Sequence, residues 1–297
     1  GRGGEKPTIT DALLLMGYID PDYFLGGEMK LEEDKTKAEM KKLSNELGLG
    51  YKETLLGIFK VANSKMARVM KKITVERGLN PKEFSILAFG GAGPLHAAYL
   101  AKELNISHVM IPPMPGVFSA LGMVTGDIVR DYSRTLITSL SDKEKLDDVI
   151  TEMSEEAVEG EKRVLLGLRY QGQSYHINIP YEENVEEKFH QEHERNYGYS
   201  NKDEEIEVIR VHLEVRKNRE VEKIPTRFGE KEEVSSRECL FLEGKKVAKV
   251  FYRKGLEVDQ STIGPAIIED TNSTLLVPPS WKFKVDNNGI VHMEEIQ

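Results

Sequence analysis

One segment, residues 84 to 113, constrains the fold of this chain more than any other. An apolar run over residues 84–89 precedes a glycine-rich turn. Alanines and leucines then repeat at helical spacing over residues 95–104, and a second apolar run over residues 108–111 ends at two prolines. Short apolar runs bounded by glycine or proline are typical of strands buried on both faces. Strand, helix and strand in this order predict a parallel βαβ unit with a right-handed crossover.

The turn between the first strand and the helix is the strongest candidate for a binding site. It consists of Gly90, Gly91, Ala92 and Gly93, and Pro94 follows in the first helical turn, where its missing N–H group costs nothing. Glycines let the backbone approach an anion closely, and a helix N-terminus offers unpaired N–H donors with a partial positive charge. The turn has neither the Gly-Lys-Ser/Thr of a P-loop nor the dinucleotide GxGxxG spacing. It therefore predicts either a phosphate site or a plain tight connection.

Several polar side chains are open to both a functional and a structural interpretation. His96 lies one turn into the predicted helix, where it could touch a nucleotide, polarise a substrate or make a structural hydrogen bond. Thr10 and Asp11 precede an apolar run and fit the N-terminal cap of a short helix. His190 and His193 have a spacing that could hold a metal, but no third ligand is identifiable, so we interpret them as surface histidines.

Two domains are expected from the change in composition near residue 138. Before it, residues 31–47 and 51–77 show the apolar spacing of amphipathic helices, and residues 115–128 predict a helix rich in small side chains. After it, a charged helix precedes runs of alternating apolar and polar residues, which are typical of strands. We therefore expect an α/β domain over residues 1–138 and a mixed α+β, strand-rich domain over residues 139–297.

Composition and charge exclude several classes of function. The net charge is -9, which argues against a general nucleic-acid partner, because neutralising phosphates needs a basic surface. The single cysteine, Cys239, rules out an internal disulfide and suits a reducing compartment. No stretch has the roughly 18 apolar residues that a membrane helix requires. The sequence predicts a cytoplasmic protein with neither a membrane nor a nucleic-acid partner.

Four separated motifs resemble the hydantoinase A/oxoprolinase family, which includes N-methylhydantoinase A, 5-oxoprolinase and the nucleotide-binding subunit of acetone carboxylase. The motifs are GRGGEKPTITDALLLMGYIDPDYFLGG, LAFGGAGPLHA, PPMPGVFSALGMVTGDIVRDY and GPAIIEDTNSTLLVPPSW, and the resemblance extends over nearly the whole chain. It implies that residues 1–138 are the second lobe of an actin-like, ribonuclease H-like ATPase domain. It covers the C-terminal part of family members.

The resemblance implies part of an ATP-dependent cyclic amidohydrolase, which opens a five-membered imide or lactam ring by phosphate activation. The alternatives are the nucleotide-binding subunit of an acetone or acetophenone carboxylase, or a non-catalytic scaffold subunit. ATP and Mg²⁺ are the implied cofactors, and a hydantoinase B-type subunit is the implied partner. Gly90 to Gly93 would hold the nucleotide, with His96 close by and Asp11 in the active cleft, whereas the metal ligands stay unknown.

The family's N-terminal Asp-x-Gly-Gly-Thr phosphate motif is absent from this sequence. This departure predicts either a truncated chain or a first lobe supplied by another polypeptide. Positioning a phosphoryl group for transfer requires both lobes and the metal. We therefore expect this chain alone not to turn over ATP.

Overall fold

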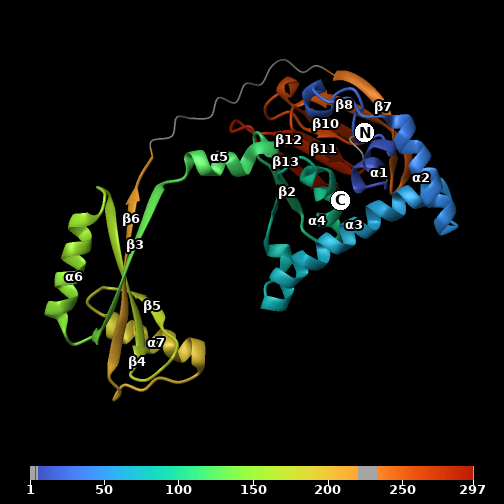
Figure 1. Cartoon of the computed structure of the whole chain (residues 1–297). Helices are drawn as coiled ribbons and strands as arrows, with labels where there is room; N and C mark the ends of the chain where they lie inside the picture. Colours follow the sequence, from blue (N-terminus) through green and yellow to red (C-terminus); the bar gives the residue numbers. More distant parts are fainter. Residues whose placement is uncertain (1–3, 5, 220–232, 297) are drawn as a thin grey trace. The chain divides into compact units, whose positions relative to one another are not determined.

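The computed structural model describes residues 4, 6–219 and 233–296, and its contacts divide the chain into two compact units (Figure 1). Unit 1 consists of residues 1–121 and 223–297, and unit 2 consists of residues 122–222. The expected boundary at residues 138–139 falls inside β3 (Ile128–Ser139), and the end of the chain returns to unit 1. The assignment of domains at 138–139 stays a prediction.

The helices of unit 1 follow the apolar periodicity of the sequence. They are α1 (Ile9–Leu15), α2 (Glu33–Leu47), α3 (Tyr51–Ile73) and α4 (Gly93–Leu104), and α5 (Phe118–Thr125) crosses the boundary to unit 2. Short 3-10 turns lie between the larger elements: η1 (Phe24–Gly27), η2 (Val75–Arg77), η3 (Pro81–Glu83), η4 (Pro115–Val117) and η5 (Arg253–Gly255). The helices predicted over residues 31–47 and 51–77 are confirmed as α2 and α3, although α3 ends at Ile73.

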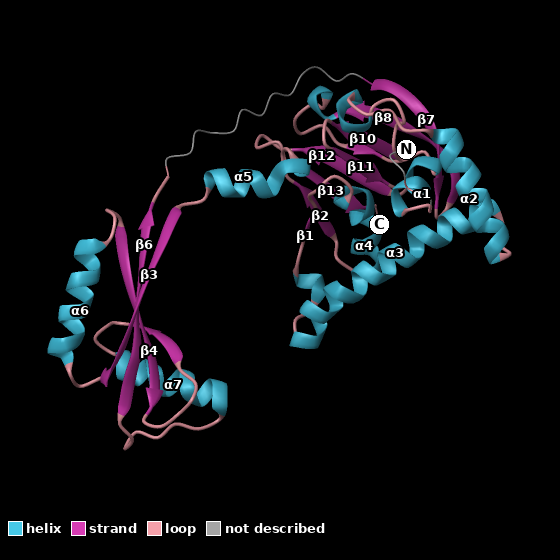
Figure 2. Ribbon diagram, viewed as in Figure 1, coloured by secondary structure: helices cyan, strands magenta, loops and turns pink. Residues whose placement is uncertain are grey.

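Two sheets form the centre of the described part of unit 1 (Figure 2). The first has the order β1 (Ile86–Leu87), β2 (His108–Ile111), β13 (Val291–Glu295), β12 (Trp281–Val285) and β9 (Thr262–Ile263). The second has the order β11 (Ser273–Val277), β10 (Ala266–Asp270), β8 (Gly244–Tyr252) and β7 (Glu233–Phe241). β1 and β2 are parallel and α4 connects them, which confirms the predicted βαβ unit.

Two hydrophobic cores hold unit 1 together, and β10 contributes to both. Ala266 and Ile268 pack in one core with α4 and the first sheet, whereas Ile267 packs in the other with α1 and α3. Successive side chains of a strand point to opposite faces, so a continuous apolar run fits a strand that is covered on both sides. This covering fixes the β10–β11 hairpin, whose tip borders the candidate site.

The prediction that residues 84–89 are buried on both faces is wrong. Ile86 and Ala88 lie in the core, but Leu87 is 44% exposed and Phe89 is 45% exposed. β1 is the edge strand of the first sheet, and only one of its faces packs against α4 and the core in the described part of the chain. An apolar run therefore shows that a strand is hydrophobic without showing that both faces are covered.

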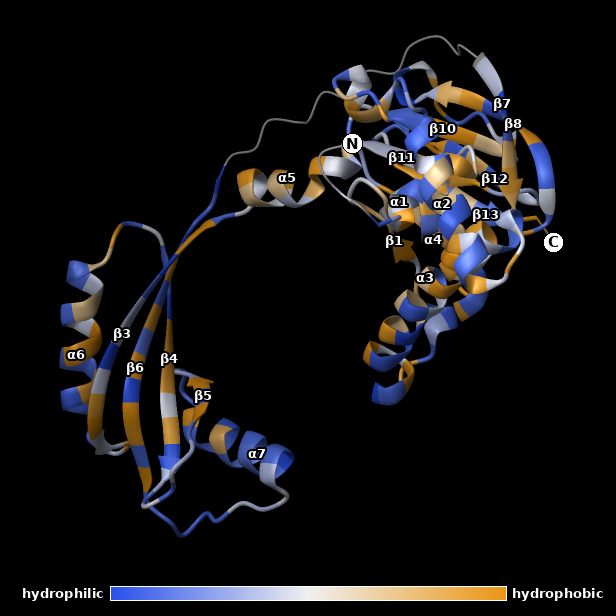
Figure 3. Ribbon diagram, turned by 45° about the vertical axis from the view of Figure 1, so that its right-hand side comes forward, coloured by the Kyte–Doolittle hydropathy of each residue, from blue (hydrophilic) through white to orange (hydrophobic). Residues whose placement is uncertain are grey.

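Unit 2 is an antiparallel sheet that packs against helices. Its strand order is β3, β6 (Ile206–Lys217), β4 (Glu161–Tyr170) and β5 (Ile177–Pro180), and its helices are α6 (Lys143–Glu156) and α7 (Val185–Tyr197). Apolar and polar residues alternate along β6, as Figure 3 shows, whereas β4 carries a continuous apolar run at residues 164–168. β3 was not predicted, because its exposed residues obscure the apolar pattern and its pairing with β6 is a long-range contact.

No helix in the described residues is long and apolar enough to cross a membrane.

Candidate functional site

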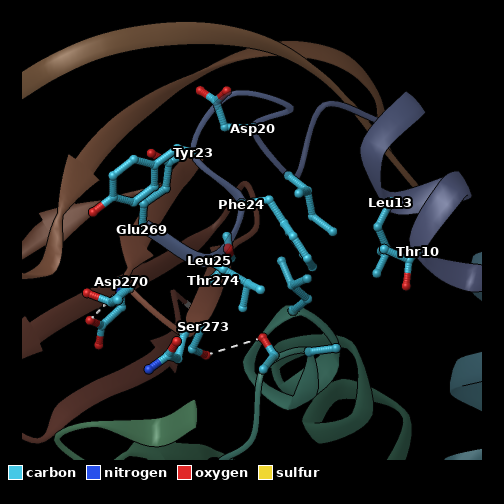
Figure 4. A pocket seen from close by; sticks show the side chains of 16 residues that line it. Thr10, Leu13, Asp20, Tyr23, Phe24, Leu25, Glu269, Asp270, Ser273 and Thr274 are labelled. Carbon is cyan, nitrogen blue, oxygen red and sulfur yellow. Dashed lines mark hydrogen bonds between the residues drawn. The ribbon is translucent and has the colours of Figure 1, made fainter. Parts of the chain in front are cut away.

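A cavity of about 260 Å³ in unit 1 lies beside the glycine-rich turn (Figure 4). Its walls come from residues 10–25, the turn and first residues of α4, and residues 269–274 at the tip of the β10–β11 hairpin. In Figure 4, Asp20, Glu269 and Asp270 lie to one side of the view, and Thr10 and Leu13 lie to the other. The cavity therefore brings together segments that are far apart in the sequence.

The hairpin tip holds the glycine turn in place through backbone oxygens. The Ser273 hydroxyl donates to the carbonyl oxygens of Gly90 at 3.0 Å and Gly91 at 3.3 Å, and the Thr274 N–H donates to Gly91 at 3.4 Å. The Gly90 N–H donates to Pro115 O at 2.7 Å, and the φ of Gly90 is +86°, a conformation that favours glycine. The carbonyl groups of the turn are thus occupied by the protein itself.

Three N–H groups of the turn, those of Gly91, Ala92 and Gly93, are free in the part of the chain that the structure describes. Within the described residues, Gly91, Ala92 and Gly93 donate no backbone N–H to any acceptor, and Gly91 and Ala92 are exposed and border the cavity. These groups lie at the N-terminus of the 12-residue helix α4, where the helix dipole favours negative charge. The structure therefore gives the predicted turn the donors that an anion requires.

One wall of the cavity is acidic and is held by Arg237 of β7. The Arg237 Nη2 lies 2.5 Å from Asp20 Oδ2 and 2.9 Å from Glu269 Oε1. Glu269 is 3% exposed, and burial raises the pKa of its carboxyl while Arg237 lowers it less. Two carboxylates share one guanidinium, so the wall is negative when both are ionised. These residues were not predicted from the sequence, although a glutamate in the apolar run of β10 is a usable signal.

Asp11 serves as a cap and does not border the cavity, whereas its neighbour Thr10 does. Its Oδ2 accepts from the Thr8 N–H at 2.6 Å and the Thr8 hydroxyl at 2.7 Å, and its Oδ1 lies 3.3 Å from the Thr36 hydroxyl. Thr8 is the N-cap of α1, one turn earlier than expected. These contacts stabilise the start of α1, and a catalytic role for Asp11 stays a prediction.

His96 is buried inside unit 1, with 5% of its surface exposed. Its Nδ1 lies 3.0 Å from Asn63 Oδ1, and its ring stacks on Phe59 at a centroid distance of 5.1 Å. The Asn63 amide nitrogen donates to Phe59 O, so Asn63 Oδ1 accepts from the His96 Nδ1–H. His96 does not border the cavity, and a catalytic role for it stays a prediction.

His96 should make the stability of unit 1 pH-dependent. Burial lowers its pKa from 6.5 to about 4, so between these values the unfolded chain binds a proton that the folded chain rejects. The stability that the neutral His96 ring contributes to the folded state is therefore fully present above pH 6.5 and is lost as the pH falls toward 4. We expect the free energy of unfolding of unit 1 to fall by about 2 kcal/mol between pH 8 and pH 5.

The measurement is urea unfolding at both pH values, followed by fluorescence of Trp281, the single tryptophan, which is buried in unit 1. The His96→Gln variant should lose about 2 kcal/mol less than the wild-type protein over this range. Equal losses in the two proteins would contradict the assignment to His96.

His190 and His193 are buried, so their interpretation as surface histidines is wrong. They are 6% and 1% exposed. The Tyr170 hydroxyl lies 2.7 Å from His190 Nδ1, and His193 Nδ1 lies 2.8 Å from Tyr199 O. The apolar face of the amphipathic helix α7 places both rings against the sheet of unit 2, where His190 contacts Tyr170 of β4 and His193 contacts the loop after α7.

Gly116 permits the hairpin tip to approach the turn after β2. A Cβ built on Gly116 would lie 2.3 Å from Asn272 O and 2.5 Å from Asn272 Cβ, which is too close for any real contact. We expect Gly116→Ala to destabilise unit 1 by about 1–3 kcal/mol and to displace the hairpin tip. The matched control is Gly57→Ala in α3, where nothing lies within 4 Å and helix propensity predicts a gain of about 1 kcal/mol. Thermal unfolding checks both, and equal stability of the two variants would contradict the prediction.

The described residues contain no group of three or more His, Cys, Asp or Glu side chains placed to hold a metal ion. Three carboxylates border the cavity, but Arg237 and Arg253 occupy oxygens of all three. This set of oxygen atoms does not fit a metal site, so we assign no role in Mg²⁺ binding to these three carboxylates.

The chain matches a known protein family over most of its length. The family model for Hydantoinase/oxoprolinase matches residues 1–132. The model for the Hydantoinase/oxoprolinase C-terminal domain matches residues 141–296. The chain belongs to the hydantoinase/oxoprolinase family. It is 33% identical to an uncharacterized protein of Methanocaldococcus jannaschii, over 99% of this chain and 45% of the relative. It is 26% identical to the caprolactamase subunit alpha of Pseudomonas jessenii, over 96% of this chain and 46% of the relative.

Solved structures share the fold. A nucleotide-free structure of acetone carboxylase, described as ATP-dependent in acetone carboxylation, superposes with a TM-score of 0.80 at 21% identity, over 97% of this chain and 46% of that one. An ATP-dependent caprolactamase from Pseudomonas jessenii superposes with a TM-score of 0.71 at 25% identity, over 99% of this chain and 48% of the caprolactamase chain. This hydantoinase/oxoprolinase chain therefore spans about half the length of the curated relatives it matches.

Proposed function

We propose that this chain is the nucleotide-binding part of an ATP-dependent cyclic amidohydrolase of the hydantoinase/5-oxoprolinase type. The observation that carries the proposal is the set of three free N–H groups, on Gly91, Ala92 and Gly93, at the start of α4 beside a cavity. A helix N-terminus with free donors is suited to phosphate oxygens. Membership of a family with ATP-dependent relatives supports ATP as the ligand.

The proposed reaction uses ATP to activate an amide. The amide oxygen of a five-membered lactam or imide attacks the γ-phosphorus, the bond to the β-phosphate oxygen breaks, and ADP leaves. Water then adds to the activated ring carbon and loses a proton. The carbon–nitrogen bond breaks as nitrogen gains a proton, which leaves an acyl phosphate. A second water then hydrolyses the acyl phosphate to a carboxylate and free phosphate. The free N–H groups at α4 would contribute by holding the nucleotide, because positioning and charge stabilisation dominate phosphoryl transfer.

A second lobe is required for this reaction. We propose that residues 1–138 form one lobe of an actin-like ATPase domain and that an upstream segment or another polypeptide provides the other. The support is that the chain covers 46% of the caprolactamase subunit alpha and 46% of the acetone carboxylase chain. Because the caprolactamase and acetone carboxylase relatives are named as subunits, we also propose a hydantoinase B-type partner.

A carboxylase subunit is the second candidate. The acetone carboxylase beta subunit of Xanthobacter autotrophicus is 23% identical over 99% of this chain and 47% of its own length. In that case ATP would activate a ketone enolate and bicarbonate. The site in this chain would hold the nucleotide in the same way.

The test is phosphate release by the complete reading frame, co-expressed with any adjacent partner gene. With ATP present, we expect a five-membered lactam or imide to stimulate phosphate release and to be opened in equal amount. Stimulation by a ketone with bicarbonate alone would favour the carboxylase. Failure of the complete protein to bind ATP would contradict both enzymatic proposals.

A further inference from the structure

We infer that the cavity beside α4 holds the sugar of the nucleotide, that the Glu269 carboxylate hydrogen-bonds the sugar hydroxyls, and that the phosphates lie at the free N–H groups of α4. This inference rests on the proposed function, because it presumes a nucleotide. Beyond the proposed function, it specifies that the sugar is the part of the nucleotide that enters the cavity and that Glu269 is the side chain that binds this sugar.

Glu269 carries an unused acceptor in the cavity wall. Its residue is 3% exposed, and its Oε1 accepts from Arg237 Nη2 at 2.9 Å. Its Oε2 has no hydrogen-bond partner among the residues that the structure describes. This oxygen is not among the fully buried, unpaired side-chain atoms of the described residues, so it keeps contact with solvent in the cavity, where a ligand hydroxyl can donate to it.

The neighbouring carboxylates, Asp20 and Asp270, also have partners in the protein. Asp20 Oδ1 accepts from the Asp22 N–H at 2.8 Å, and Asp20 Oδ2 pairs with Arg237. Asp270 Oδ1 accepts from the Thr271 N–H at 2.8 Å, and Asp270 Oδ2 lies 3.8 Å from the Nε of buried Arg253. At 3.8 Å this ion pair is too long for a hydrogen bond, so Glu269 and Asp270 each keep an oxygen for a ligand in the described residues, and Glu269 is the more buried of the two, with 4% of its side chain exposed against 19%.

The charge of this wall selects the kind of group that can enter. Ionised carboxylates accept hydrogen bonds and do not donate them, so they attract hydroxyl groups and repel phosphate oxygens. The opposite preference holds at Gly91 and Ala92, whose free N–H groups also border the cavity. A ligand with hydroxyl groups at one end and phosphate at the other matches both walls.

The size of the cavity also points to a part of the nucleotide. Its volume is about 260 Å³, below the roughly 300–1,000 Å³ of pockets that enclose a whole drug-sized ligand. Leu13, Tyr23 and Phe24 give it apolar sides, which suit the carbon faces of a sugar or base. The charged phosphates would then remain in the open beside α4.

The experiment is calorimetric titration of the complete protein, the full reading frame with any partner subunit, with Mg·ATP, Mg·2′,3′-dideoxy-ATP and inorganic triphosphate. We expect the dideoxy nucleotide to bind about 10- to 100-fold more weakly than ATP, as for the loss of hydrogen bonds to a charged group. Triphosphate should bind more weakly still. The Glu269→Gln variant should bind ATP more weakly than the wild-type protein does. It should also lose most of the wild-type preference for ATP over dideoxy-ATP. The matched control is Glu238→Gln, whose side chain is 62% exposed on β7, and it should bind like the wild-type chain.

The wild-type titrations alone decide the inference if Glu269→Gln fails to fold. Equal affinity for ATP and dideoxy-ATP would overturn the sugar assignment and leave nucleotide binding intact. Triphosphate binding as tightly as ATP would also overturn it, because the cavity would then add nothing. No binding of ATP would overturn the proposed function and this inference with it.

Discussion

Gly91→Asp is expected to reduce the affinity of the complete protein for Mg·ATP at least about 100-fold with little change in its free energy of unfolding. The introduced carboxylate would lie just before α4 and accept from the free N–H groups that phosphate would otherwise use. Negative charge at a helix N-terminus stabilises the helix, so the fold should tolerate the change while the ligand is repelled. Calorimetric titration and urea unfolding measure the two effects separately.

Gly91→Ala is the matched control. Its Cβ would lie 3.4 Å from Asn272 O, a tight but possible contact, and it adds no charge. We expect this variant to retain ATP affinity within about threefold, since a loss of 0.6 kcal/mol is close to that factor. Wild-type affinity in a folded Gly91→Asp protein would remove the turn from the nucleotide site.

The largest expected effect on stability comes from Arg253, a buried guanidinium at the end of β8. It is 6% exposed, and its Nη2 donates to the carbonyl oxygens of Ile111, Pro112 and Gly289 at 3.2, 2.9 and 2.8 Å. Burial lowers its pKa to about 10. Arg253→Met would leave these carbonyls and the carboxylate of Asp270 without their partner, and we expect a loss of about 3–5 kcal/mol.

Urea unfolding followed by Trp281 fluorescence checks this prediction. The control is Arg77→Met, an exposed arginine of unit 1, which should change stability by less than about 0.5 kcal/mol. Equal stability of the two variants would show that the buried guanidinium contributes nothing beyond its desolvation cost.

The candidate site was predictable in part. Gly91 and Ala92 were found from the sequence, because a glycine-rich turn between a strand and a helix is a local pattern with a direct chemical meaning. Glu269 and Asp20 were not found as cavity residues, since their roles depend on contacts with Arg237, more than 200 residues after Asp20. His96 was placed near the site by its position in the helix, but a local pattern does not show which face of α4 packs against α3.

By itself, the sequence determined the elements whose stability is local and the family to which the chain belongs. The βαβ unit, the helices α2 and α3 and the free donors at the start of α4 follow from apolar periodicity and glycine chemistry within short windows. The tertiary structure alone decided that β3 is a strand, that Leu87 is exposed and that the Glu269 carboxylate faces a cavity. Burial and hydrogen-bond partners depend on segments that meet only when the chain folds, so no local pattern contains them.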